Sequence, residues 1–180
     1  MLQKEYIIKT ERLGLRNWLP TDLGPFAEMC ADEEVMKHFP KTLSEEETQE
    51  LITRLRDHFH EFGYTYFALD LLEKGEFLGF AGLKHQQWES EFTPCIDIGW
   101  RLKKSAWGHG YATEAAKACL NASRSKFGIK EVLSFTTNTN MASEHVMKKI
   151  GMDFIGTVQH PMMVGDPRFK HCVVYKINCK

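Results

Sequence analysis

Two hydrophobic periods alternate along this chain and divide it into predicted helices and strands. Apolar residues recur at helical spacing in four segments, which are 23–30, 51–62, 112–127 and 141–150. Runs rich in β-branched and aromatic residues predict a short first strand from 6–8 and 13–16, entered through a polar bend at 10–12. They predict further strands at 64–72, 77–86, 95–102, 131–136, 154–159 and 170–177. The mixture indicates an α/β (α+β) domain.

Capping and turn residues set the boundaries of these elements. Ser44 opens a capping box that begins the second predicted helix, and Gly63 ends that helix. Gly128 and Gly151 end the third and fourth helices, and Gly75 lies in the turn of an antiparallel hairpin. The third helix connects the strands 95–102 and 131–136, and such a crossover makes these two strands parallel.

Composition matters here chiefly for what it excludes. The 180 residues contain no Pro-, Gly- or Ser-rich linker, so we expect one domain over residues 1–180. The 23 Lys and Arg nearly balance the 24 Asp and Glu, which argues against nucleic acid or an anionic membrane as a partner. No leader pattern is visible at the N-terminus, and no apolar run approaches the roughly eighteen residues of a membrane span. We expect a cytoplasmic protein.

The residues that commonly bind metals are scattered. The cysteines are odd in number and form no C-x-x-C pair: Cys30, Cys95, Cys119, Cys172 and Cys179. Neither a disulfide framework nor a zinc site is indicated. His58 and His60 lie two residues apart on a predicted helix and therefore point away from each other. We expect no metal cofactor.

A glycine-rich loop joins the strand 95–102 to the helix that follows it. Gly108 and Gly110 let successive backbone N–H groups point into one concavity, and the helix N-terminus adds its positive dipole end. A phosphate or pyrophosphate would fit there. No Gly-Lys-Ser/Thr follows, which excludes a P-loop, and Thr113 replaces the third glycine of a dinucleotide fingerprint. A turn with glycines for steric reasons alone is the alternative.

Three stretches together resemble the GNAT N-acetyltransferase superfamily. They are Ile98-Gly99-Trp100-Arg101-Leu102, Trp107-Gly108-His109-Gly110-Tyr111-Ala112-Thr113-Glu114-Ala115, and Asn140-Met141-Ala142-Ser143 followed by Lys149-Ile150-Gly151-Met152. The resemblance spans nearly the whole chain, and the nearest branch is the RimJ/RimL group, which acetylates N-terminal amines of ribosomal proteins. It implies a mixed, mostly antiparallel sheet splayed open between the strands 95–102 and 131–136, with helices on both faces.

The same resemblance implies where acetyl-CoA binds. The cofactor would lie between the splayed strands, with its pyrophosphate on the glycine loop, its pantetheine along the end of the strand 95–102, and its pantetheine arm held by an asparagine. The implied cofactor-binding residues are Arg101, Leu102, Gly108, His109, Gly110, Tyr111, Ala112, Thr113 and Asn140. Four basic residues are candidates for the ribose phosphate, or are ordinary solvated charges: Arg124, Lys126, Lys148 and Lys149.

Two positions depart from the family pattern. Ser105 stands three residues before the first glycine, where the family usually has Gln or Arg, but backbone groups should still bind the phosphate. Met147 stands where many relatives carry a tyrosine general acid, and a thioether has no proton to donate. Ser143 matches the RimJ/RimL position proposed to bond the CoA sulfur, and is otherwise a helix-capping residue. His145 is a weaker candidate for the same role.

Acetyl transfer also needs a neutral amine. Asp97 matches the position of a glutamate base in a number of relatives, and could act directly or through a water, although a strand carboxylate is often merely paired. Glu89 or Glu91 could serve instead. A dedicated base is optional for an α-amine, whose pKa of about 7.7–8.0 lies well below the value of about 10.4 for lysine. His85 and Trp88 lie in the corresponding acceptor-side region.

These features predict an acetyl-CoA-dependent N-acetyltransferase that acts on a primary amine, most readily a peptide or protein N-terminus, by direct attack in a ternary complex. A non-catalytic acyl-CoA-binding module, suggested by Met147, and an enzyme for small-molecule amines remain alternatives. The segments 37–43, 85–94 and 160–169 are expected to choose the acceptor. The protein would be a monomer or a homodimer.

Overall fold

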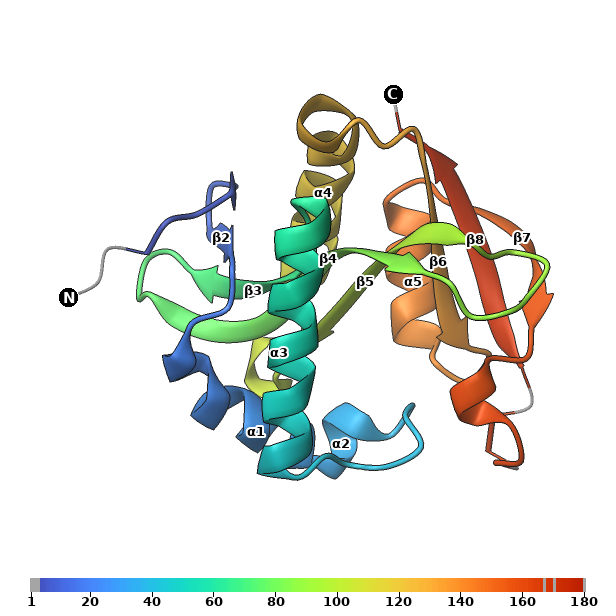
Figure 1. Cartoon of the computed structure of the whole chain (residues 1–180), viewed down its shortest axis with the longest axis horizontal. Coiled ribbons are helices and arrows are strands. Elements are labelled where there is room, and N and C mark those ends of the chain that lie inside the picture. The colour runs from blue at the N-terminus through green and yellow to red at the C-terminus, as the bar shows by residue number, and fades with distance from the viewer. Residues whose placement is uncertain (1–3, 167, 170, 180) are drawn as a thin grey trace.

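An eight-stranded sheet runs through the computed structural model, which describes residues 4–166, 168–169 and 171–179 (Figure 1). The strand order is β1-β2-β3-β4-β5-β6-β8-β7, and only the β5–β6 pair is parallel. The strands are β1 (Ile8–Lys9), β2 (Leu13–Arg16), β3 (Tyr66–Leu71), β4 (Glu76–Gln86), β5 (Cys95–Leu102), β6 (Glu131–Thr137), β7 (Asp153–Val158) and β8 (Cys172–Asn178). The predicted strands are therefore present, except that the single first strand predicted from 6–8 and 13–16 is two antiparallel strands, β1 and β2. The prediction placed Lys170 in the last strand, but Lys170 lies outside the described residues.

Helices cover both faces of this sheet. They are α1 (Leu23–Ala31), α2 (Glu33–Met36), α3 (Glu45–Phe62), α4 (Tyr111–Phe127) and α5 (Met141–Lys149). The Ser44 side chain and Glu47 form the predicted capping box at the start of α3. Gly63 ends α3 and Gly128 ends α4, both in the left-handed conformation that glycine adopts without strain.

The sheet opens between β5 and β6, as the family resemblance implied. Eight registered pairs join β4 to β5, but only Asp97 and Leu133 are in register between β5 and β6. The Ser134 hydroxyl adds one cross-link by donating to the Ile98 carbonyl at 2.9 Å. Beyond this point the edge of β5 has no strand partner in the described part of the chain, so its backbone is available to a ligand that pairs like a strand.

Side chains of β5 alternate between two hydrophobic cores. Ile98 and Leu102 point into the larger core, under α4 and α5. Asp97 and Arg101 point to the opposite face, on the side where α1 and α3 pack over Phe80. The two functional candidates on this strand therefore share one face of the sheet.

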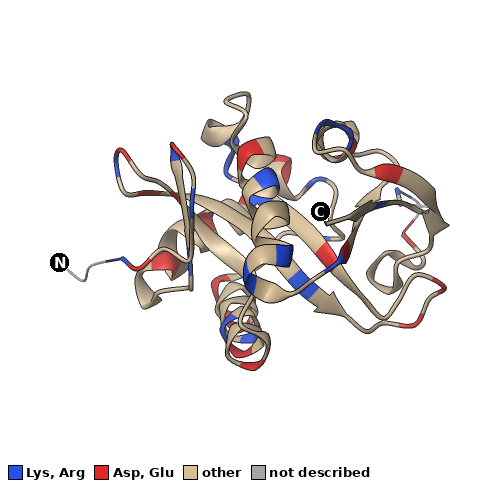
Figure 2. Cartoon of the chain, turned by 90° about the horizontal axis from the view of Figure 1, so that it is seen from above, with Lys and Arg blue, Asp and Glu red and all other residues tan. Residues whose placement is uncertain are grey.

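Charge is distributed evenly over the molecule. Acidic and basic residues are interspersed along the ribbon in Figure 2 rather than gathered on one basic face. Among the described residues, no helix has the length and apolar character needed to span a bilayer. The same residues contain no group of three His, Cys, Asp or Glu side chains placed to hold a metal ion.

Candidate active site

The loop between β5 and α4 presents a row of free backbone donors. Gly108 and Gly110 both have φ of +79°, a conformation that L side chains rarely adopt. Within the described part of the chain, none of the backbone N–H groups from Gly108 to Thr113 donates a hydrogen bond. The N-terminus of α4 lies at the same place and favours negative charge. This arrangement suits a pyrophosphate.

The space above this loop is open. A Cβ added to Gly108 would meet nothing within 4 Å, and one added to Gly110 would meet only Arg12 Nη2 at 3.9 Å. The Arg12 guanidinium lies 4.7 Å from the centre of the Tyr111 ring and forms an ion pair with Glu114. Arg12 is therefore a cation beside the loop, which the sequence reasoning did not assign to the site.

Asp97 lies buried near the middle of β5, with only 7% of its surface exposed. Tyr66 Oη donates to the carboxylate, at 2.6 and 2.8 Å from its two oxygens, and Gln86 Nε2 donates at 3.2 Å. Burial raises the pKa of Asp97 to about 6, although both hydrogen bonds act in the opposite direction. The group is thus largely ionised at pH 7 yet able to take up a proton, as a general base requires.

A glycine in β5 makes room for the Tyr66 side chain. Tyr66 in β3 is in register with Gly82 in β4, and Gly82 is in register with Gly99 in β5. A Cβ on Gly99 would lie 3.0 Å from Tyr66 Cζ, so the ring crosses the sheet over these positions and reaches Asp97 two strands away. Tyr66 was not predicted, because nothing local in the sequence indicates this contact.

Comparison with known proteins identifies the family. The family described as "Acetyltransferase (GNAT) domain" matches residues 12–153. The chain is a GNAT acetyltransferase. It is 28% identical to the uncharacterized protein YkkB of Bacillus subtilis over 83% of this chain and 87% of that one, and 27% identical to the uncharacterized N-acetyltransferase YnaD of the same organism over 81% of each.

Solved structures show the same fold. A GNAT-family acetyltransferase from Bacillus anthracis matches with a TM-score of 0.78 and 26% identity, covering 95% of this chain and 97% of that one. RimL, the ribosomal L7/L12 α-N-protein acetyltransferase, matches at 0.76 and 18% over 97% and 98% of the two chains. Spermidine N-acetyltransferase from Vibrio cholerae matches at 0.74 and 16% over 94% and 97%. At such low identity, the last two show the fold alone.

In this GNAT enzyme, α5 follows β6 and so begins across the gap between β5 and β6 from the glycine loop. Asn140 caps α5, because its Oδ1 accepts from the Ser143 backbone N–H at 3.1 Å, which leaves its amide N–H₂ group available. The Ser143 hydroxyl is partly exposed and makes no hydrogen bond within the described residues. Met147 is only 1% exposed and packs in the core, and His145 is exposed on α5. Ser143 and His145 therefore both stay candidates for the proton donor.

Several basic residues lie away from the glycine loop. Arg124 and Lys126 are in the last turn of α4, roughly 20 Å along the helix from its N-terminus. Lys126 Nζ donates to the Ile7 carbonyl at 2.6 Å, and Arg124 Nη1 donates to the Cys179 carbonyl at 3.4 Å. The structure does not bring these two residues to the pyrophosphate loop. Lys148 pairs with Glu144 on α5 at 2.7 Å.

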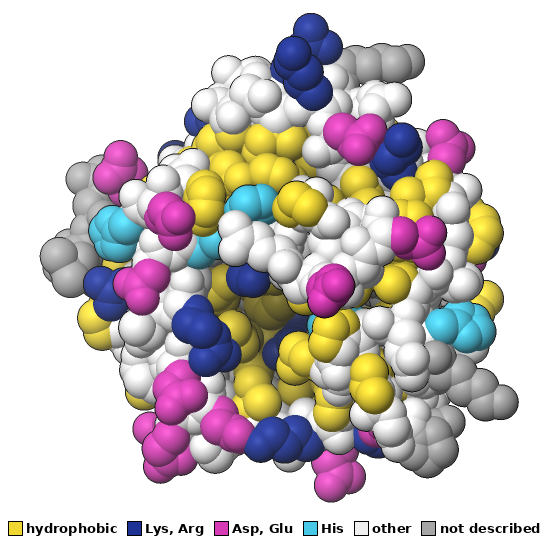
Figure 3. Space-filling model, turned by 45° about the vertical axis from the view of Figure 1, so that its right-hand side comes forward, with side chains coloured by type: hydrophobic (Ala, Val, Ile, Leu, Met, Phe, Trp, Pro, Cys, Tyr) yellow, Lys and Arg dark blue, Asp and Glu magenta, His cyan; other side chains and the backbone are white. Residues whose placement is uncertain are grey.

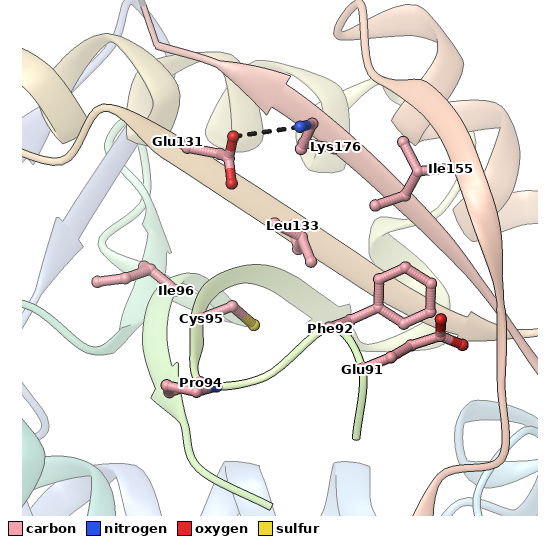
Figure 4. A pocket seen from close by; sticks show the side chains of 9 residues that line it. All are labelled: Glu91, Phe92, Pro94, Cys95, Ile96, Glu131, Leu133, Ile155 and Lys176. Carbon is pink, nitrogen blue, oxygen red and sulfur yellow. Dashed lines mark ion pairs between the residues drawn. The ribbon is translucent and has the colours of Figure 1, made fainter. Parts of the chain in front are cut away.

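The alternative bases are not grouped with the loop either. Glu91 is exposed and lines a hollow of about 300 Å³ near the first residues of β5 and β6, opposite the end of β5 that leads into the glycine loop (Figure 4). Glu89 is exposed in the same connection. His85 points to the other face from Asp97, since its neighbour Lys84 is the residue in register with Asp97.

The three segments expected to choose the acceptor do meet. Arg168 Nη2 donates to the Pro40 carbonyl at 2.9 Å, and the Trp88 and His160 rings lie 4.6 Å apart. Figure 3 shows a hollow on one face of the molecule, lined by hydrophobic side chains with basic groups inside it. Among the described residues, two buried side-chain N–H groups lack a partner, Trp88 Nε1 and Arg101 Nε.

Proposed function

We propose that this chain transfers the acetyl group of acetyl-CoA to the α-amine at the N-terminus of a peptide or protein, by direct attack in a ternary complex. The row of unpaired N–H groups from Gly108 to Thr113 carries the proposal, because it fits the cofactor's pyrophosphate. The unpaired edge of β5 suits the pantetheine, although the Leu102 carbonyl already accepts from Trp107 Nε1 at 2.9 Å.

Asp97 and Tyr66 would remove the proton from the attacking amine. An α-amine with a pKa of about 8 is mostly protonated at pH 7 and must lose its proton before attack. Asp97 is ionised under these conditions and hydrogen-bonded to Tyr66, so it can accept that proton through Tyr66 or through a water. The acetyl-CoA thioester supplies the activated acyl group.

Ser143→Ala should lower the chemical step by about tenfold while leaving acetyl-CoA affinity nearly unchanged. The Ser143 hydroxyl has no other partner in the described chain and can donate to the departing sulfur. The effect is modest because a thiol with a pKa of about 8.5 is a tolerable leaving group. Single-turnover kinetics measures this step directly. Full activity in the variant would assign proton donation to water or His145, and Met147→Tyr would then be the informative second change.

A comparison of two peptide classes tests the acceptor. At pH 7.5, peptides with free N-termini should have a kcat/KM at least tenfold above that of N-blocked peptides that carry lysine. The reason is that the neutral fraction of an α-amine exceeds that of lysine by roughly two orders of magnitude. Equal values for the two classes would contradict the α-amine assignment.

The two alternative functions predict other outcomes. A non-catalytic module would bind acetyl-CoA but release no thiol with any amine. An enzyme for small-molecule amines would acetylate a polyamine or aminoglycoside in preference to both peptide classes.

A further inference from the structure

Two of the arginines in this protein, Arg16 and Arg101, differ in the partners of their guanidinium groups. Arg16 is 2% exposed and fully satisfied, because it donates to Asp22 and Asp70 through four hydrogen bonds of 2.7–2.9 Å. Arg101 has no carboxylate partner among the described residues, and its Nε is buried without an acceptor. A guanidinium removed from water normally requires such partners, as Arg16 shows.

Aromatic rings hold the Arg101 head group in place. Its guanidinium carbon lies 4.0 Å from the centre of the Phe39 ring and 5.3 Å from that of Phe80. Its Nη1 lies 3.5 Å from Cys30 Sγ, and a thiol sulfur is a weak acceptor. Stacking orients the planar group but leaves its charge without a counterion. The site is thus ready for an anion that the described residues do not supply.

The position of Arg101 connects it with the reaction. It lies on the same face of β5 as Asp97, four residues further along, which is roughly 13 Å in an extended strand. The Tyr66 ring, which covers Asp97, stacks on the Phe80 ring at a centroid distance of 5.2 Å. Phe39 belongs to the segment 37–43, one of the three expected to choose the acceptor.

We propose that the Arg101 guanidinium binds a carboxylate of the amine acceptor. The inference rests on the proposed function, since it places the acceptor's amine near Asp97 and its anionic group near Arg101. The separation matches about four residues of an extended peptide at about 3.3 Å each. The acceptor is therefore a peptide with an acidic side chain, or its own terminal carboxylate, about four residues after the amine. Polycationic amines are disfavoured by the same charge.

Matched peptides test this assignment. Peptides that carry Glu at position 5 are compared with otherwise identical peptides that carry Gln there, so that only the charge differs. The wild-type protein should prefer the Glu peptide by roughly tenfold or more in kcat/KM, which is the range expected for a charged hydrogen-bonded pair. In Arg101→Met this ratio should fall to about one. In Arg101→Lys it should be intermediate, because lysine keeps the charge but lacks the planar fork.

The ratio of the two kcat/KM values cancels any general loss of turnover in the variants. Equal rates for the two peptides in the wild type, or an unchanged ratio in Arg101→Met, would overturn the inference but leave the α-amine assignment intact. Absence of thiol release with every peptide would instead contradict the proposed function. If Arg101→Met does not fold, N-acetylated forms of the Glu and Gln peptides are tested as inhibitors of the wild type. The Glu peptide should inhibit roughly tenfold more strongly than the Gln peptide, and equal inhibition would overturn the inference.

Discussion

Gly110→Val should raise the dissociation constant for acetyl-CoA by about 100-fold or more. Gly110 has φ of +79°, which a β-branched residue cannot adopt without strain, so the backbone at the start of α4 must rotate. Rotation turns the N–H groups of the loop away from the pyrophosphate. Each hydrogen bond to a charged group contributes about 1.5–3 kcal/mol, so losing one or two accounts for the expected change.

The rest of the fold should tolerate this substitution. A Cβ at Gly110 has only Arg12 Nη2 within 4 Å, at 3.9 Å, so no packed side chain is displaced. Ser105→Ala is the matched control, because Ser105 is exposed in the turn before the loop and its hydroxyl has no partner in the described residues. Calorimetry should show an acetyl-CoA affinity within about twofold of wild type for this control. Unchanged affinity in a folded Gly110→Val protein would contradict the pyrophosphate assignment.

Asp97→Asn should lower kcat/KM for an N-terminal amine by about 10²–10³-fold and remove its dependence on pH near 6. Burial raises the pKa of Asp97 to about 6. Below that pH the wild-type carboxylate is protonated and cannot act as a base, so the rate falls; above it the base is free. The side-chain amide of the variant does not titrate and cannot reproduce this acid limb. A pH profile of kcat/KM in both proteins measures the difference.

The same variant should not be less stable than wild type near pH 7. The native pKa of about 6 lies above the unfolded value of 3.8, so ionisation of Asp97 disfavours the folded state by on the order of 3 kcal/mol at neutral pH. That cost develops as the pH rises from about 4 to 6, and it is absent in the variant. Tyr66→Phe serves as a second probe, because loss of its hydrogen bond should move the acid limb to higher pH. An unchanged pH profile in Asp97→Asn would exclude Asp97 as the general base.

The elements and the anion loop could be predicted because their signals are local. The capping box at Ser44 and the left-handed glycines Gly63 and Gly128 end or begin helices through their own backbone preferences. Gly108 and Gly110 likewise indicated a turn with free N–H groups, because the backbone preference of glycine does not depend on contacts with distant segments. The splay between β5 and β6 came instead from the resemblance to a family.

The acceptor side could not be predicted because its contacts join distant segments. Tyr66 reaches Asp97 across 31 positions of sequence, and Arg101 meets Cys30 across 71 positions. No periodicity or spacing specifies such pairs. Arg124, a candidate for the ribose phosphate or an ordinary solvated charge, lies at the end of α4 away from the glycine loop, and its role stays a prediction.

Backbone amide NMR during a titration with CoA tests the central claim most directly. The account predicts that the largest shifts, in the direction expected for new hydrogen bonds, fall on the consecutive N–H groups from Gly108 to Thr113. The amides of Arg124 and Lys126 should hardly move. The account would be contradicted if the amides of the loop were unaffected while the largest shifts clustered at the hollow formed by Glu91 and Lys176.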